Sequence, residues 1–192
     1  MQKLIISGGN PLRGTIKISG SKNATLPILA ASILNNKKIT LTNIPIVQDV
    51  ETMVQLLKVL GSKIKTDKRR KKINILNKNN LKTFAPYNLL RTMRAGIVVL
   101  GPLLAKFKKA KVSLPGGCAI GSRPIDLHLF ALKKMGASIK IQNGYISAKA
   151  KEGLKGCRIN FPKVSVGATE NTLIAASYAS GTTTITNCAI EP

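Results

Sequence analysis

The sequence predicts an α/β fold made of repeated units, because two internal similarities each join a helix to a strand. Residues 57–65 (LKVLGSKIK) and 132–140 (LKKMGASIK) share the end of an apolar-periodic helix, a glycine and the start of a strand. Residues 30–43 (AASILNNKKITLTN) and 174–187 (IAASYASGTTTITN) share a helix of small residues followed by a threonine-rich strand. These similarities divide the chain into three units, which we place at about residues 16–81, 86–150 and 155 onward.

The first unit begins with a predicted strand and a predicted buried helix. Alternation in IKIS (residues 16–19) predicts a half-buried strand, after which Gly20 and Ser21 offer a turn and an N-cap. We expect the helix to begin near Lys22 and to end at Asn35. Its segment LPILAASIL is apolar nearly all round, which predicts a helix buried on every side.

The rest of the first unit has the pattern of a strand, a helix and a hairpin. KITLTNI (residues 38–44) predicts a strand, and the apolar spacing after Asp49 predicts a helix that stops at Gly61. SKIKT and KINIL form a predicted hairpin whose exposed tip carries KRRKK (residues 68–72). A second basic run, KFKKAK from Lys106, is also interpreted as a connection.

The second and third units follow the same plan. Asp126 opens a helix that corresponds to the one opened by Asp49, and the strand YISAK from Tyr145 corresponds to INIL. The third unit has an entry strand (CRINF), a helix from about Ala168 and the strand TTTITN. The chain stops where the first unit continues into its Asp-initiated helix. We therefore expect the third unit to be truncated and the chain to be a fragment.

One stretch, residues 113–128 (SLPGGCAIGSRPIDLH), has the pattern of a ligand site. Its adjacent glycines allow the backbone to come close to a ligand, and Cys118 follows them directly. Arg123 and Pro124 are typical of a helix start, where free amides and the positive end of the helix dipole favour a bound anion. Such surroundings also favour the thiolate form of a cysteine. The alternative is a small buried cysteine beside a tight turn.

The composition raises one rival function. Lysine and arginine number 31 against 7 aspartate and glutamate, a net charge of +24 that would attract nucleic acid. Aromatic residues make up only 4% and tryptophan is absent, so the stacking platforms typical of single-strand binders are missing. We therefore favour a solvated basic surface over nucleic-acid recognition.

Cysteine usage and hydropathy bear on the compartment. Cys118, Cys157 and Cys188 are odd in number and lack metal-ligand spacing, so neither disulfides nor a metal site is expected. No apolar run is long enough to span a membrane, and the N-terminus lacks a secretory signal pattern. The sequence therefore predicts a cytoplasmic protein without a membrane partner.

Five segments occur in a fixed order along the chain. They are Lys22-Asn23 after Ser-Gly-Ser, Pro86-Tyr87 followed by RTMRA (residues 91–95), PGGC (115–118), GSRPIDLH (121–128) and KVSVGAT (163–169). Together they resemble the UDP-N-acetylglucosamine 1-carboxyvinyltransferases, the enolpyruvyl transferases that open peptidoglycan synthesis. The similarity runs along the whole chain, and the order of the segments is far more specific than any of them alone.

The resemblance implies a particular α/β fold and a missing domain. Members of this family have two domains, each an inside-out α/β barrel of three βαβαββ-type repeats with helices inside and sheets outside. Residues 1–19 would be N-terminal strands, of which the first, residues 3–7, belongs with the second domain. Residues 20–192 would be the first domain, incomplete at its C-terminal end. The first strand would then lack partners in this chain.

The resemblance also implies a reaction without a cofactor or a metal. The enolpyruvyl group of phosphoenolpyruvate is transferred to the 3-hydroxyl of UDP-N-acetylglucosamine, and phosphate is released. Cys118 matches the catalytic cysteine, which donates a proton, forms an adduct with phosphoenolpyruvate and is alkylated by fosfomycin. This reaction links the family to cell wall biogenesis, cell shape and cell division.

The resemblance assigns the remaining contacts to two ligands. Lys22 and Arg123 match positions around the phosphate and carboxylate of phosphoenolpyruvate, and Asn23 matches a position that contacts the substrate near Lys22. The positions that match sugar-nucleotide ligands are Arg94, Arg123, Pro124, Ile125, Asp126, Leu127, Lys163, Val164, Ser165 and Val166. The general base and a further arginine come from beyond the end of this chain, so we expect the isolated chain to be inactive and poorly stable.

Several alternatives remain open at this point. The sister transferase that acts on shikimate 3-phosphate has the same repeats but lacks the PGGC loop. Asp49 is near the active site in the family, although helix capping explains it equally well. His128 is interpreted as a hydrogen-bonded structural residue rather than a general base. Arg91 is given no role, and Ser165 with Gly167 could form only a turn before a helix.

Overall fold

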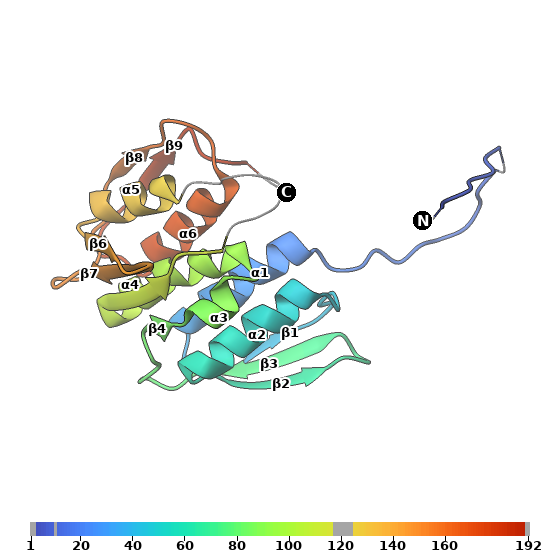
Figure 1. The fold of residues 1–192 in the computed structure, drawn as a ribbon, viewed down its shortest axis with the longest axis horizontal. Coiled ribbons are helices and arrows are strands. Elements are labelled where there is room, and N and C mark those ends of the chain that lie inside the picture. Colours follow the sequence, from blue (N-terminus) through green and yellow to red (C-terminus); the bar gives the residue numbers. More distant parts are fainter. Residues whose placement is uncertain (1–2, 10, 117–124, 191–192) are drawn as a thin grey trace.

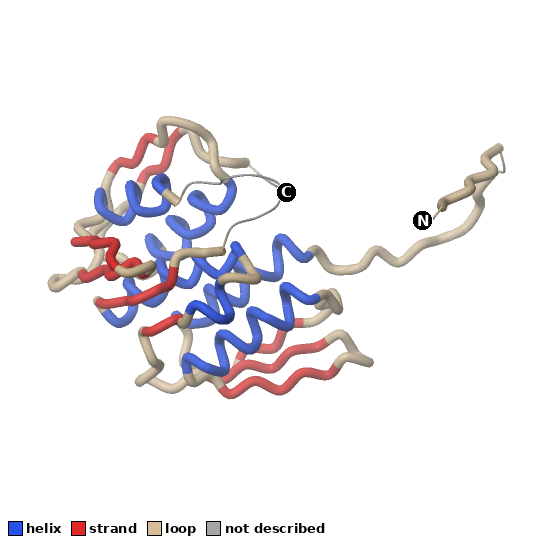
Figure 2. The backbone as a smooth tube through the Cα atoms, in the orientation of Figure 1, coloured by secondary structure: helices blue, strands red, loops and turns tan. Residues whose placement is uncertain are grey.

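The computed structural model describes residues 3–9, 11–116 and 125–190 (Figure 1). Within these residues, helices lie at the centre and three small sheets lie around them (Figure 2). The long extended segment before the first helix leads away from this body (Figure 1). Within the described residues, no helix is both long enough and apolar enough to cross a membrane.

The first sheet is antiparallel and is covered by a helix. Its strands lie in the order β1-β3-β2, and Ile39 and Ile64 both pair with Ile75 of the middle strand. Alternation buries Ile73 and Ile75 of β3, and α2 lies along this sheet (Figure 1). The bounds are β1 Ile39–Leu41, α2 Gln48–Leu60, β2 Lys63–Asp67 and β3 Lys72–Leu76. The predicted hairpin and its exposed basic tip are confirmed.

The second and third sheets extend the same pattern. Strands β5, β7 and β6 lie in the same relative order as β1, β3 and β2, and β4 adds a parallel edge beside β5. In the third sheet, β8 and β9 are likewise parallel. The bounds are β4 Phe84–Ala85, β5 Lys109–Ser113, β6 Ser138–Gln142, β7 Tyr145–Lys149, β8 Arg158–Asn160 and β9 Thr184–Thr186.

The core lies where the helices pack on one another. Helix α4 packs on α6, α5 packs on α6, and α1 packs on α2. The bounds are α1 Lys22–Ala31, η1 Ser32–Leu34, α3 Tyr87–Leu90, η2 Arg94–Val99, α4 Leu100–Phe107, α5 Asp126–Lys134 and α6 Val166–Ala176, where η denotes a 3-10 helix. Fully buried leucines such as Leu29, Leu57 and Leu103 fill the space between these elements.

Helix α1 begins where the sequence predicts. Ser21 is its N-cap, and its side chain accepts a hydrogen bond from the Ala24 amide. Pro27 lies inside the helix without preventing its formation. The expectation of burial on every side is wrong, because Ile28 is 49% exposed while Leu26 and Leu29 are buried.

The predicted strand at residues 16–19 does not form. Ile16 and Ile18 are 84% and 78% exposed, and this stretch pairs with none of the described strands. Alternation signals a half-buried strand only when a neighbouring strand is present to receive it. Residues 3–7 are also exposed and unpaired among the described parts.

Three smaller expectations also need correction. The basic run KFKKAK is not a connection. Lys106 lies in the last turn of α4 and Lys109 begins β5, so only Lys108 lies between the helix and the strand. The third-unit helix begins at Val166 rather than near Ala168. Asp49 lies in the first turn of α2, but the N-cap position is occupied by Val47, so capping does not explain the aspartate.

Candidate functional site

The starts of α1 and α2 meet at one end of the molecule. Lys22, the first residue of α1, places its Nζ 2.8 Å from Oδ2 of Asp49 in the first turn of α2. The two side chains are 47% and 34% exposed, so solvent and ligands can reach both. The pair explains Asp49 better than helix capping does.

A glycine contact sets the approach of the chain to α1. A Cβ on Gly20 would lie 1.8 Å from the carbonyl oxygen of Asn43, so only glycine fits against the turn that precedes α2. The Ser21 cap follows immediately, and Asn23 is exposed in the first helical turn. This close packing brings Lys22 over the start of α2.

The described start of the 113–128 stretch packs against the beginning of the second unit. A Cβ on Gly116 would lie 2.3 Å from the carbonyl oxygen of Arg91, so this end of the stretch lies directly against the backbone there. Arg94, three residues later, begins η2 and is half-buried. Cys118, Arg123 and Pro124 lie outside the described residues.

The starts of α5 and α6 carry the other predicted contacts. Asp126 is exposed at the first position of α5, whereas the Leu127 side chain is buried, so only its backbone can face a ligand. The other contacts predicted in this region are the half-buried Ile125 before α5, the exposed Lys163 and Val164 before α6, Ser165 at the N-cap and Val166 at the first helical position.

The α6 start is built like that of α1. The Ser165 side chain accepts a hydrogen bond from the Ala168 amide at 3.4 Å, and Thr169 donates to the Ser165 carbonyl at 2.8 Å. In α1, Ser21 and Thr25 make the same two bonds. Ser165 is therefore a helix cap rather than part of a simple turn, and Gly167 lies inside the helix.

His128 joins these helices from within the core. It is 7% exposed, and its Nδ1 lies 3.1 Å from the Nδ2 of Asn171 in α6. The Asn171 Oδ1 accepts the amide N–H of Gly101 in α4 at 2.8 Å. Burial lowers the pKa of His128 to about 4, although Asp126 opposes this shift.

The predicted structural role of His128 is thus confirmed, but the sequence reasoning missed its partner. Asn171 is completely buried in α6, where the other buried residues are Ala168, Thr169, Thr172 and Ala175. A polar amide in such a helix is the signal that could have revealed it, because a buried amide needs hydrogen-bond partners.

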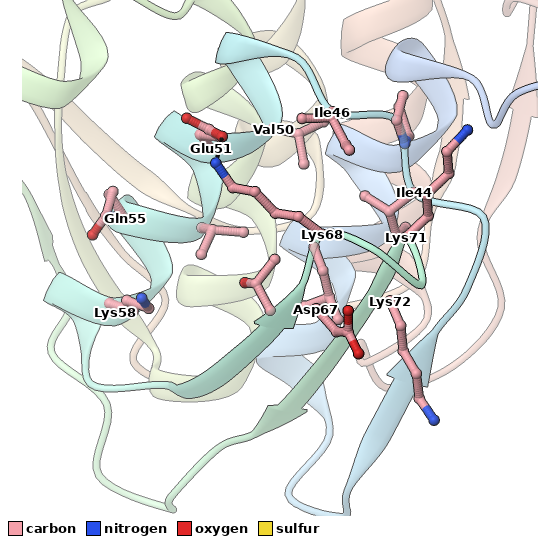
Figure 3. A pocket seen from close by; sticks show the side chains of 14 residues that line it. Ile44, Ile46, Val50, Glu51, Gln55, Lys58, Asp67, Lys68, Lys71 and Lys72 are labelled. Atoms are coloured by element: carbon pink, nitrogen blue, oxygen red, sulfur yellow. Dashed lines mark hydrogen bonds and ion pairs between the residues drawn. The ribbon is translucent and has the colours of Figure 1, made fainter.

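A separate groove lies between α2 and the tip of the β2–β3 hairpin (Figure 3). It has a volume of about 230 Å³ and an aliphatic floor that includes Ile44, Val50 and Ile73. Lys68 reaches across it to Glu51, with 2.6 Å between Nζ and Oε1 (Figure 3). Of the predicted site residues that the structure describes, none lines this groove.

Comparison with known proteins identifies the family. The profile described as EPSP synthase (3-phosphoshikimate 1-carboxyvinyltransferase) matches residues 6–192. The chain belongs to the EPSP synthase family. A protein from Pelagibacter ubique, named UDP-N-acetylglucosamine 1-carboxyvinyltransferase, is 63% identical over the whole chain, which covers 46% of that protein. A protein of the same name from Rickettsia akari is 55% identical, again with 46% covered.

Solved structures of EPSP synthase family members and related transferases share the fold. The enolpyruvyl transferase NikO from Streptomyces tendae aligns with a TM-score of 0.76 at 18% identity, over 93% of this chain and 41% of that one. EPSP synthase from Acinetobacter baumannii aligns with a TM-score of 0.69 at 20% identity, over 90% and 40%. The chain thus has the mixed α/β fold of enolpyruvyl transferases and spans about half the length of the curated relatives it matches.

Proposed function

We propose that this chain is the N-terminal part of a UDP-N-acetylglucosamine 1-carboxyvinyltransferase. The observation that carries the proposal is identity of 52–63% with proteins of that name along the whole chain. The complete protein would transfer the enolpyruvyl group of phosphoenolpyruvate to UDP-N-acetylglucosamine. The reaction belongs to peptidoglycan precursor synthesis in the cytoplasm, and fosfomycin would inhibit it by alkylating Cys118.

The chemistry of the site residues supports this reaction. The sugar 3-hydroxyl adds to the central carbon of phosphoenolpyruvate while the methylene carbon takes a proton from Cys118. Loss of phosphate and of one proton from the methyl group then regenerates a carbon–carbon double bond. Phosphoenolpyruvate carries a phosphate and a carboxylate, and the Lys22 ammonium and the Arg123 guanidinium would stabilise both charges. The exposed position of Lys22 at a helix start suits this role.

The sugar nucleotide would bind where the starts of several helices meet. Arg94, Asp126 and the 163–166 segment begin or precede η2, α5 and α6 respectively. A helix start presents free amide groups to a diphosphate. We assign the UDP-sugar contacts to Asn23, Arg94, Arg123, Pro124, Ile125, Asp126, Leu127, Lys163, Val164, Ser165 and Val166.

The finer architecture is part of the same proposal. The shared strand order of the first two sheets and the parallel pairs β4–β5 and β8–β9 support three related repeats. The central helices and peripheral sheets support an inside-out barrel (Figure 1). We propose that the third repeat is truncated, and that a second domain of the complete protein supplies the general base and partners for residues 3–7.

The decisive experiment measures phosphate release by a complete protein. This chain would be joined to the part of the Pelagibacter ubique relative that lies outside the match, and we call the product the joined protein. We expect phosphate release from phosphoenolpyruvate with UDP-N-acetylglucosamine and none with shikimate 3-phosphate in its place. The Cys118→Ala variant should lose the activity with UDP-N-acetylglucosamine. Turnover with shikimate 3-phosphate alone would instead support the activity named in the family description.

A further inference from the structure

Three helices of the core are joined by one buried chain of hydrogen bonds. The Gly101 amide of α4 donates to Asn171 Oδ1 of α6, and Asn171 Nδ2 lies against His128 Nδ1 of α5. The His128 side chain is 7% exposed and Asn171 is fully buried, so water does not compete for these bonds.

The backbone amide of Gly101 fixes the donor and the acceptor of each of these hydrogen bonds. An N–H group only donates, so the Asn171 atom that faces it must be the carbonyl oxygen. The other end of the Asn171 amide is therefore its NH₂ group, which donates to His128. Nδ1 of His128 must then be an unprotonated acceptor, and the neutral ring carries its proton on Nε2. Protonation of Nδ1 would place two donors against each other.

Gly101 allows α4 and α6 to come this close. A Cβ on Gly101 would lie 2.3 Å from Asn171 Oδ1 and 2.6 Å from the Asn171 carbonyl oxygen, so the α4 backbone rests directly on α6. On the other side, the His128 ring edge packs against Gly167, where a Cβ would lie 3.4 Å from Cε1. The spacing of α5 and α6 is thus set by the ring of His128 and by the amide of Asn171.

The starts of α5 and α6, close to these hydrogen bonds in sequence, carry proposed sugar-nucleotide contacts. His128 lies two residues after Asp126, and the Gly167 that it contacts lies directly after Val166. We propose that His128 and Asn171 are positioning residues, which hold the starts of α5 and α6 at the separation that the UDP-sugar requires. The inference rests on the proposed function and adds two residues to it.

The tautomer is tested on this chain directly, because His128 is its only histidine. Nitrogen-15 NMR of the imidazole should show a proton on Nε2 and a bare Nδ1 at neutral pH. Asn171→Asp keeps an oxygen for the Gly101 amide but replaces the donor by a carboxylate oxygen, so it should shift His128 to the doubly protonated ring. A proton on Nδ1 in the wild type would overturn the assignment. So would a protonation state of His128 that is the same in Asn171→Asp as in the wild type.

The positioning role is tested by kinetics of the joined protein. His128→Phe keeps a ring but removes the acceptor, whereas His128→Asn keeps an amide oxygen close to the position of Nδ1. In His128→Phe we expect KM for UDP-N-acetylglucosamine to rise on the order of tenfold or more, with KM for phosphoenolpyruvate changed less than about twofold. His128→Asn should restore most of the affinity for the sugar nucleotide.

The outcomes separate this inference from the proposed function. If the joined protein turns over but His128→Phe changes both KM values equally, or neither, the positioning role is wrong and the proposed function stands. Should the wild-type joined protein show no turnover, the proposed function fails while the NMR result still reports on the tautomer. Circular dichroism and thermal unfolding show whether each variant folds. If His128→Phe does not fold, the KM values of His128→Asn are compared with those of the wild type instead.

Discussion

His128 illustrates how a single buried side chain links pH to stability. Its ring is neutral in the folded protein because burial lowers its pKa to about 4 from the ordinary value of 6.5. The nearby Asp126 carboxylate works in the opposite direction but does not outweigh burial. The Asn171 amide adds a geometric reason, since it donates to the ring and leaves no acceptor for a second proton on Nδ1.

The free energy of unfolding should therefore fall as the pH falls from 6.5 towards 4. In this window the unfolded chain binds a proton at His128 and the folded chain does not. The difference amounts to about 2 kcal/mol between pH 7.5 and pH 5. Urea unfolding at several pH values measures it, and His128→Phe should lose this contribution. Equal pH dependence in the variant and the wild type would contradict the assignment.

Gly101 and Gly167 form a matched pair at the helix contacts. Gly101→Ala would drive a methyl group into the Asn171 backbone and should destabilise the chain by about 2 kcal/mol or more. Gly167→Ala only reaches ordinary contact distance from His128 and gains helix propensity, so its effect should be neutral or stabilising. Thermal unfolding of both variants measures the difference, and similar unfolding temperatures would refute the close-packing argument.

At the scale of elements, capped helix starts organise the candidate site. In α1 and α6 a serine caps the helix and a threonine four residues later donates to the serine carbonyl. This shared arrangement leaves other amides of the first turn available to a ligand. It also places Lys22 and Val166 at equivalent positions of the two helices.

Removal of the α1 cap should loosen its first turn. We expect Ser21→Ala to lower the free energy of unfolding by about 1 kcal/mol, because the Ala24 amide loses its acceptor. Ser21→Asn keeps a capping oxygen and should remain within about 0.5 kcal/mol of the wild type. Urea unfolding gives both values. If alanine and asparagine behave alike at this position, the cap does not contribute to stability.

The elements also show how far local patterns could predict this fold. The hairpin β2–β3 and helix α2 follow from their periodicity and from Gly61, whose φ of 108° suits a helix end. Residues 16–19 have an equally clear alternation and yet form no strand. The strands β4 and β8 succeed because β5 and β9 lie beside them in parallel. Alternation of apolar residues indicates which face of a strand would be buried. Whether the strand forms depends on an adjacent strand with which it can pair.

At the scale of the whole molecule, the N-terminal segment stands apart from the core. Leu4, Ile6 and Leu12 are between 84% and 96% exposed, and Ile16 and Ile18 are similarly uncovered. These aliphatic side chains contribute little to the stability of the described body, since stabilisation by apolar groups requires their burial. They form an apolar surface of the kind that a further part of a protein covers.

Deletion of residues 1–15 should have opposite effects in two settings. In this chain it should change the free energy of unfolding by less than about 0.5 kcal/mol, because the described residues of the segment, 3–9 and 11–15, are exposed. In the joined protein the same deletion should lower the unfolding temperature, since the proposed second domain would lose a strand. Thermal unfolding of all four proteins measures this contrast. A deletion that destabilises this chain would place the segment within the first domain.

The sequence by itself determined the family segments, the start of α1 and the β2–β3 hairpin, because each depends on residues close together in the chain. Only the tertiary structure decided that Lys22 pairs with Asp49 and that His128 meets Asn171, which are 27 and 43 residues apart. Those contacts depend on how closely the helices pack, and Gly20 and Gly101 permit that approach. Periodicity indicates which face of a helix is buried, whereas the hydrogen-bond partner on that face is chosen by packing.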